Sequence, residues 1–277
     1  MLRSRIRSCA GTPVVCSAST LGRRGSVHEV IRSGEVRLSA HLARPADGAG
    51  AEPRRGLVLC HGFPAGPQGA ETAGESYPEF ADHLAREAGW TVLTFNFRGS
   101  GESEGQFSLG GWLDDVRAAV DHLSSVDGVG GVWLAGSSTG GALAICETAE
   151  DQRVRGVATL AAPADFADWA SDARAFLDHA REVGVITDRS FPPDFDRWAG
   201  ELREIRPVGV IGKIPPRPCL LVHGAEDDVV PPEDARLLAD ASEGHAELRL
   251  VNGAGHRLRH DPRAVAVLLG WLERQAL

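Results

Sequence analysis

The sequence predicts an α/β domain: a mostly parallel central sheet flanked by helices and preceded by an antiparallel hairpin. Short, continuous apolar runs recur along the chain, as expected for parallel strands that are buried on both faces. Between them lie segments whose apolar residues recur every three or four positions, which is typical of helices that cover such a sheet. Strict alternation near residue 30 indicates the hairpin.

The elements follow in this order. Residues 27–31 and 36–40 alternate apolar and polar side chains on either side of Ser33-Gly34, so we predict a hairpin there. The apolar runs predicted as strands are residues 56–60, 90–97, 132–135, 154–160, 219–222 and 248–251. Helical periodicity covers residues 80–88, 112–123 and 264–271.

One long segment, about residues 163–217, interrupts this alternation between two predicted strands. It is longer than a simple crossover needs, and it contains Trp169, Phe176, Phe191, Phe195 and Trp198. We interpret it as a small helical cap inserted above the strand ends. The alternative is that its aromatic residues only attach an extra helix to the core.

Charge and cysteine usage exclude several classes of protein. The 277 residues include 38 acidic and 29 basic side chains, for a net charge of −9. Five arginines precede the first acid, Glu29, which leaves −14 on the rest of the chain and disfavours nucleic acid or an anionic membrane as a partner. Cys60, Cys146 and Cys219 lie in apolar runs, so we expect reduced, buried thiols. No cysteine or histidine spacing predicts a metal site.

No apolar stretch approaches the roughly 18 residues that a membrane span needs. We therefore expect a soluble, cytoplasmic protein without a cofactor, either monomer or homodimer. Residues 1–25 are rich in Arg and Ser and lack acids, and we expect a disordered or dispensable segment there; an organelle-targeting peptide is the alternative. The main domain would then be residues 26–277.

The pattern Gly-x-Ser-x-Gly occurs twice, around Ser103 and around Ser138. A nucleophile elbow requires a buried strand directly before the first glycine and a helix directly after the serine. Ser138 has both, because residues 132–135 are apolar and residues 140–144, which begin with two glycines and an alanine, can open a helix that packs closely. Ser103 lies in a polar loop, so Ser138 is the predicted nucleophile and Ser103 is assigned a turn-forming role.

A serine nucleophile needs a histidine base, and the base needs a carboxylate that orients it. The predicted strand 219–222 is followed by an acidic loop that contains Asp227 and Asp228. The last predicted strand is followed by Gly253-Ala254-Gly255-His256. Both candidates therefore lie just beyond the carboxyl end of a strand, where ligands bind to such sheets.

Together these motifs resemble the α/β-hydrolase superfamily, and most closely small cinnamoyl or feruloyl esterases. The resemblance rests on His61-Gly62-Phe63, Arg98-Gly99-Ser100-Gly101, the Ser138 elbow, the Asp227 loop and the His256 motif, which span residues 57–256 in the family's order. It implies a triad of Ser138, Asp227 and His256, with Asp228 and His260 as the alternatives for acid and base. It also implies that the backbone amides of Phe63 and Thr139 form an oxyanion hole.

The function implied by this resemblance is hydrolysis of carboxylic esters of small to medium organic acids through an acyl-enzyme, with a small-molecule ester as partner. Serine at the elbow disfavours dehalogenases, epoxide hydrolases and dienelactone hydrolases, which carry Asp or Cys there. The alternatives are a thioesterase, amidase or peptidase with the same triad, or a ligand receptor on the same fold. Asn96 departs from the family, which often has Asp at this place; this departure concerns loop anchoring more than chemistry.

Overall fold

The computed structural model describes residues 21–22, 26–45 and 53–275. Its sheet has nine strands in the order β1-β2-β3-β5-β4-β6-β7-β8-β9 within this part of the chain. The strands are β1 Leu21–Gly22, β2 Ser26–Ser33, β3 Val36–Ala43, β4 Arg54–Cys60, β5 Thr91–Phe95, β6 Val129–Ser137, β7 Val154–Leu160, β8 Cys219–Gly224 and β9 Ala246–Val251. The pairs β1/β2, β2/β3 and β3/β5 are antiparallel, and all the others are parallel. The predicted fold class is thereby confirmed.

The predicted hairpin is β2 and β3, and its turn lies one residue later than expected. Ser33 pairs with Val36, so the turn residues are Gly34 and Glu35. Gly34 has φ 59°, a left-handed conformation that glycine adopts without steric cost. Of the basic segment 1–25, only β1 is described, and it pairs with the start of β2; the remainder of that segment lies outside the described residues.

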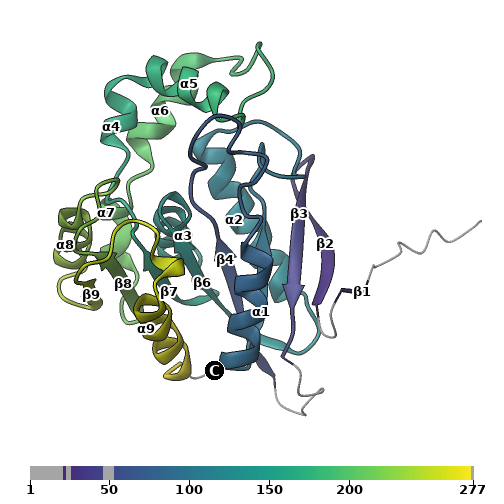
Figure 1. Ribbon diagram of the computed structural model, residues 1–277, viewed down its shortest axis with the longest axis vertical. Coiled ribbons are helices and arrows are strands. Elements are labelled where there is room, and N and C mark those ends of the chain that lie inside the picture. The colour runs from purple at the N-terminus through teal and green to yellow at the C-terminus, as the bar shows by residue number, and fades with distance from the viewer. Residues whose placement is uncertain (1–20, 23–25, 46–52, 276–277) are drawn as a thin grey trace, which may run out of the picture.

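Helices cover both faces of the sheet (Figure 1). They are α1 Tyr77–Ala88, α2 Leu109–Ser124, α3 Thr139–Glu150, α4 Ala167–Ser171, α5 Ala173–Glu182, α6 Phe195–Glu204, α7 Pro207–Val210, α8 Pro232–Ala241 and α9 Pro262–Glu273, with short 3-10 turns η1 Ile211–Lys213 and η2 Leu258–His260. Residues of α1 and α9 form one hydrophobic cluster, while residues of α2, α3 and α8 belong to the other.

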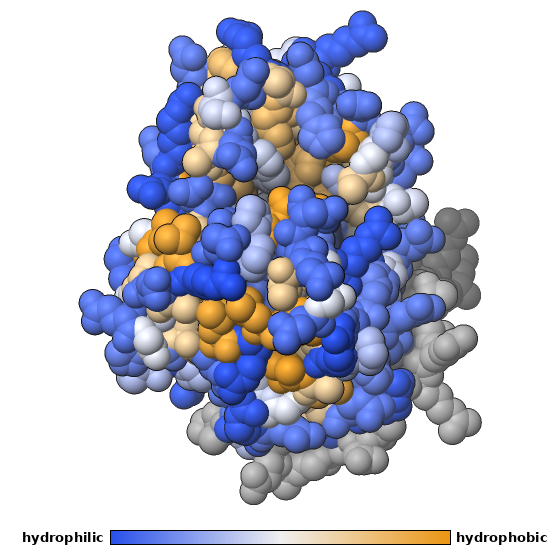
Figure 2. All heavy atoms as spheres, turned by 60° about the vertical axis from the view of Figure 1, so that its left-hand side comes forward, coloured by the Kyte–Doolittle hydropathy of each residue, from blue (hydrophilic) through white to orange (hydrophobic). Residues whose placement is uncertain are grey.

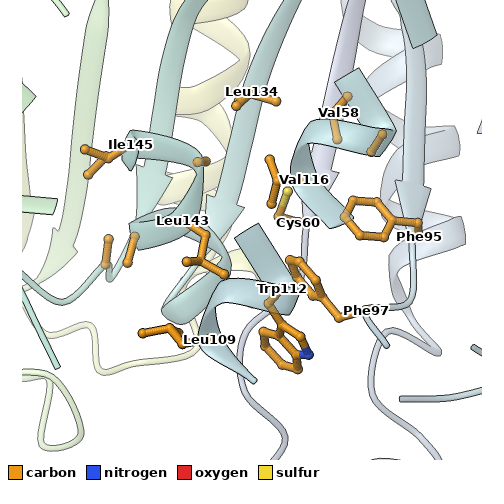
Figure 3. Packing of buried hydrophobic residues seen from close by; sticks show 14 of the residues in the cluster. Val58, Cys60, Phe95, Phe97, Leu109, Trp112, Val116, Leu134, Leu143 and Ile145 are labelled. Atoms are coloured by element: carbon orange, nitrogen blue, oxygen red, sulfur yellow. The ribbon is translucent and has the colours of Figure 1, made fainter. Parts of the chain in front are cut away.

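Alternation along β4 explains why its residues 57–60 are all apolar. Leu57 and Leu59 pack in the cluster with α1 and α9, whereas Val58 and Cys60 pack in the cluster with α2 and α3. Figure 3 shows this second cluster, in which Trp112 of α2 lies against Phe97. The two rings stack with centroids 4.3 Å apart. The central strands are therefore buried on both sides, and they hold the loops at their carboxyl ends in place.

Capping side chains and glycines set the ends of several helices. The hydroxyl of Ser108 accepts a hydrogen bond from the Gly111 amide at the start of α2. Asp261 accepts one from the Arg263 amide at the start of α9, where Pro262 occupies the first turn. At the other end of α1, Gly89 adopts φ 73° and donates to the Ala85 carbonyl.

The long segment between β7 and β8 contains α4 to α7 and η1. In Figure 1, α4, α5 and α6 lie beyond one end of the sheet. Trp198 of α6 is buried, and its indole N–H donates to the Phe107 carbonyl at 3.1 Å. This contact ties the segment to the loop before α2. Its exact limits, and a role as a cap, stay predictions.

Candidate active site

Ser138 lies at the sharp turn where β6 ends and α3 begins. Its backbone has φ 50° and ψ −126°, a combination that residues other than glycine rarely adopt. Gly140 permits the close approach of α3, because a Cβ there would lie 2.2 Å from the His61 carbonyl oxygen. This strand–turn–helix geometry is that of a nucleophile elbow, which presents its side chain above the sheet edge.

Ser103, in the second Gly-x-Ser-x-Gly match, has a different environment. Its hydroxyl donates to the Asn96 carbonyl at 2.6 Å and accepts from the Ser39 amide at 2.9 Å. The first bond closes the loop after β5 on itself, and the second ties this loop to β3. Ser103, to which the sequence assigns a turn-forming role, therefore stabilises a loop in the structure.

His256 and Asp227 meet although they belong to loops after different strands. His256 Nδ1 lies 2.9 Å from Asp227 Oδ2. Because a carboxylate only accepts, Nδ1 carries the hydrogen and Nε2 is left as an acceptor. The alternative acid, Asp228, is exposed at the cavity mouth, and the alternative base, His260, lies in η2 on the cavity wall.

The Asp227 carboxylate is buried and accepts hydrogen bonds from neighbouring protein groups. Its side chain is 0% exposed, and its Oδ1 accepts from the amides of Val229 and Val230 at 2.9 Å each. Burial alone would raise its pKa, but hydrogen bonds from His223, His256 and these amides hold the pKa of Asp227 well below its ordinary value. The group is therefore ionised at neutral pH and can orient an imidazole.

The backbone amides of Phe63 and Thr139 are the candidates for an oxyanion hole, and both residues line the same cavity as Ser138. Thr139 is the first residue of α3, and Phe63 lies in the loop that follows β4. Neither amide donates a hydrogen bond to another of the described residues. Gly62 allows the loop to pass close to Ser138, since a Cβ there would lie 3.0 Å from the Ser138 Cβ. Two unused N–H groups beside a serine can stabilise an oxyanion.

His61 anchors the loop that carries Phe63. Its Nδ1 donates to the Gly62 carbonyl at 2.8 Å, and its Nε2 accepts from the Phe97 amide at 3.1 Å. Burial lowers the pKa of His61 to about 4, so the ring is neutral at neutral pH, as these two bonds require.

Ser138, Thr139, Phe63 and His256 all line one cavity of about 960 Å³. The segment between β7 and β8 contributes two aromatic walls, Phe166 and Trp169, whose ring centroids are 5.1 Å apart. Other polar lining residues are Asp165, Asp168, His179, Asp228, Asp234, Arg257, His260 and Asp261. The cavity is large enough for a medium-sized organic molecule.

The surface beside this site is polar. Figure 2 shows the side of the molecule that carries α8 and α9 as mostly hydrophilic, with hydrophobic residues in separate patches. Val229 at the cavity mouth and Leu237 on α8 are 65% and 53% exposed. Single exposed apolar residues of this kind are common on protein surfaces.

Sequence reasoning missed two histidines that belong to the site. His179, on α5, is exposed and also lines the cavity, 6.0 Å from the Phe63 ring. His223 directly follows the predicted strand 219–222, and its Nε2 lies 3.3 Å from Asp227 Oδ2. A polar residue at the end of an apolar strand was the available signal for His223, while nothing local identifies His179.

The described residues contain no group of three or more His, Cys, Asp or Glu side chains that could hold a metal ion. Cys60, Cys146 and Cys219 are free and buried, and burial raises the pKa of Cys146 and of Cys219 to about 12. Their thiols therefore stay protonated. Among the helices that the structure describes, none is long and apolar enough to cross a membrane.

A model of the alpha/beta hydrolase family matches residues 57–268. The chain belongs to this family. The family and the fold together support a hydrolase.

Curated relatives match only parts of the chain. The protein YfhR of Escherichia coli O157:H7 is 28% identical over 173 residues, which cover 61% of this chain and 54% of YfhR. The chain thus spans about half the length of this relative. The quorum-quenching protein AidA of Acinetobacter baumannii is 31% identical over 131 residues, 45% of this chain and 40% of AidA.

Solved structures are similar over most of the chain. Est1E from Butyrivibrio proteoclasticus superposes with a TM-score of 0.65 at 18% identity, covering 89% of this chain and 96% of Est1E. The esterase Pf2001 of Pyrococcus furiosus has a TM-score of 0.62 at 17% identity, covering 88% and 90%. At such identities the likeness establishes the shared fold.

Proposed function

We propose that the protein is a serine hydrolase that cleaves carboxylic esters of small to medium organic acids. One observation carries the proposal: a serine on a strained elbow and a histidine paired with a buried carboxylate open onto the same cavity. Structures of Est1E, including one with ferulic acid bound, lend support because that protein shares the fold. A cytoplasmic location and independence from cofactors belong to the same proposal.

In the proposed reaction, Ser138 Oγ attacks the ester carbonyl carbon while its proton passes to His256 Nε2. Asp227 holds His256 in the required tautomer and stabilises the imidazolium that forms. The amides of Phe63 and Thr139 donate to the oxyanion of the tetrahedral intermediate. When the C–O bond breaks, His256 gives its proton to the leaving alcohol, and Ser138 is left acylated.

Deacylation repeats these steps with water as the nucleophile. His256 takes a proton from the water, hydroxide adds to the acyl carbon, and the same amides hold the second oxyanion. Collapse of this intermediate returns the proton to Ser138 Oγ and releases the carboxylic acid. Phe166 and Trp169 would bound the acyl or alcohol group, which gives residues 163–217 the role of a cap.

The test is labelling with a fluorophosphonate probe together with a panel of p-nitrophenyl esters. We expect wild-type protein to label at Ser138 and to turn over short and medium acyl esters, and Ser138→Ala to abolish both. Ser103→Ala is the matched control, since it removes the serine of the other Gly-x-Ser-x-Gly match and should retain labelling. Turnover that persists in Ser138→Ala would refute the proposal.

The same assay separates the alternatives. Faster release from matched thioesters or anilides would move the assignment to a thioesterase or an amidase with the same triad. Saturable binding of esters without labelling or turnover would instead favour a receptor on this fold.

A further inference from the structure

A second histidine contacts the proposed catalytic acid. His223 is in β8 and is 1% exposed. Its Nε2 lies 2.9 Å from the Val230 carbonyl oxygen and 3.3 Å from Asp227 Oδ2. A carbonyl only accepts, so Nε2 carries a hydrogen and donates it to Val230, and Asp227 Oδ2 is a second, longer contact of the same nitrogen.

Asp227 Oδ2 therefore lies between two imidazole N–H groups. One comes from His256 on the cavity side, and the other comes from His223 on the buried side. The second oxygen is already occupied by the amides of Val229 and Val230. The His223–Val230 bond also closes the loop that carries Asp227 back onto β8, so one side chain restrains both the loop and the carboxylate.

We propose that His223 is a positioning residue that shares the Asp227 carboxylate with His256 and thereby sets the pH range in which His256 acts as a base. The inference rests on the proposed function. A donor on Oδ2 draws negative charge away from His256, so the imidazolium of His256 is less stabilised than it would be by Asp227 alone. His223 thus keeps His256 in its neutral, working form down to a lower pH.

Other titratable and charged groups face this pair within the described residues. Asp234, half-buried at the start of α8, is the other carboxylate whose charge acts on His223. On the cavity side, the titratable and charged groups that line the same space as His256 are Asp165, Asp168, Asp228, Asp261, Arg257, His179 and His260. A substitution at position 223 alters none of these groups, so their effect on the pH profile is the same in the wild-type protein and in the variants.

The test compares His223→Gln, whose side-chain amide can still donate at the distance of Nε2, with His223→Asn, whose shorter side chain cannot. The pH profile of kcat/KM is measured for both with a p-nitrophenyl ester. We expect the Asn variant to lose about tenfold in kcat at little change in KM and to shift the midpoint of the acid limb upward by about half a pH unit or more. The Gln variant should restore both toward wild type.

A purely structural role for His223 would lower stability or kcat but leave the acid limb where it was in both variants, and this result would overturn the inference. Equal shifts in the Gln and Asn variants would also overturn it, because the donor would then be irrelevant. An NMR titration of the His256 imidazole in the same variants needs no substrate. If the titration midpoint of His256 moves only in the Asn variant while the protein hydrolyses no ester, the coupling between His223 and His256 is supported and only the proposed function is refuted.

Discussion

Replacing Asp227 with asparagine tests the proposed acid–base pair with almost no change in shape. Oδ1 of Asp227 accepts two backbone N–H groups, so the amide oxygen of asparagine should take that place. The NH₂ group then occupies the position of Oδ2, where the N–H groups of His223 and His256 now point. Donor would face donor, and His256 can relieve this only by moving its hydrogen to Nε2.

That tautomer cannot take a proton from Ser138, because its Nε2 is already protonated. We expect kcat/KM to fall about 10⁴-fold, equivalent to about 5 kcal/mol of transition-state stabilisation. KM should change little, since the Asp227 side chain is 0% exposed and cannot reach the substrate.

The assay is steady-state hydrolysis of a p-nitrophenyl ester by purified Asp227→Asn and Asp228→Asn proteins, with circular dichroism to check folding. Asp228→Asn is the matched control: the same substitution one residue later, on a side chain exposed at the cavity mouth. It should stay within a few-fold of wild type. A folded Asp227→Asn protein that keeps more than a tenth of wild-type activity, or an equal loss in both variants, would refute the assignment.

Three further predictions concern stability and specificity. Burial raises the pKa of Glu147 to about 7, although the charge of Arg117 opposes this shift. The Glu147 carboxyl therefore loses its proton at a lower pH in the unfolded chain than in the folded one. The free energy of unfolding consequently falls as the pH rises from about 4.5 to 7. Glu147→Gln should accordingly gain on the order of 1–3 kcal/mol in urea unfolding at pH 8 and little at pH 4.5, and equal gains at both would contradict this. Trp169→Ala should raise kcat/KM for bulky acyl esters relative to acetyl esters, because Trp169 lines the cavity. Trp198→Phe is the control, since Trp198 is outside the cavity lining, and it should leave that ratio unchanged. An unaltered ratio in both variants would favour the alternative that these aromatic residues only attach the segment to the core. Five aspartates and one arginine line the cavity. A negatively charged hemisuccinate ester should therefore react about tenfold more slowly than a neutral ester of equal length at low salt, and this difference in rate should narrow as salt is added. A difference in rate that salt leaves unchanged would exclude electrostatic selection.

Much of the architecture was predictable because its signals are local. The apolar run 154–160 is β7 to the residue, and the run 219–222 lies within β8. The Ser138 elbow was recognisable because strand, turn and helix are adjacent in sequence and each has its own pattern. Only small errors arose, such as the hairpin turn, where a shift of one residue depends on pairing between two strands.

The pairing of Asp227 with His256 was predictable only through the family's order of motifs, because 29 residues separate them in sequence. Nothing in the sequence indicates that His223 would share Oδ2, or that His179 would reach the cavity. These contacts depend on how the segment between β7 and β8 packs and on how neighbouring strands are ordered.

By itself, the sequence determined the succession of strands and helices, the serine at the elbow and the acidic character of the chain, since periodicity, turn chemistry and charge are properties of short segments. The tertiary structure alone decided which amides, imidazoles and aromatic rings surround that serine. Parallel strands bring their carboxyl ends to one edge of the sheet, and the loops that meet there come from residues 61 to 256. Their distances are set by packing between layers, a property that no single segment carries.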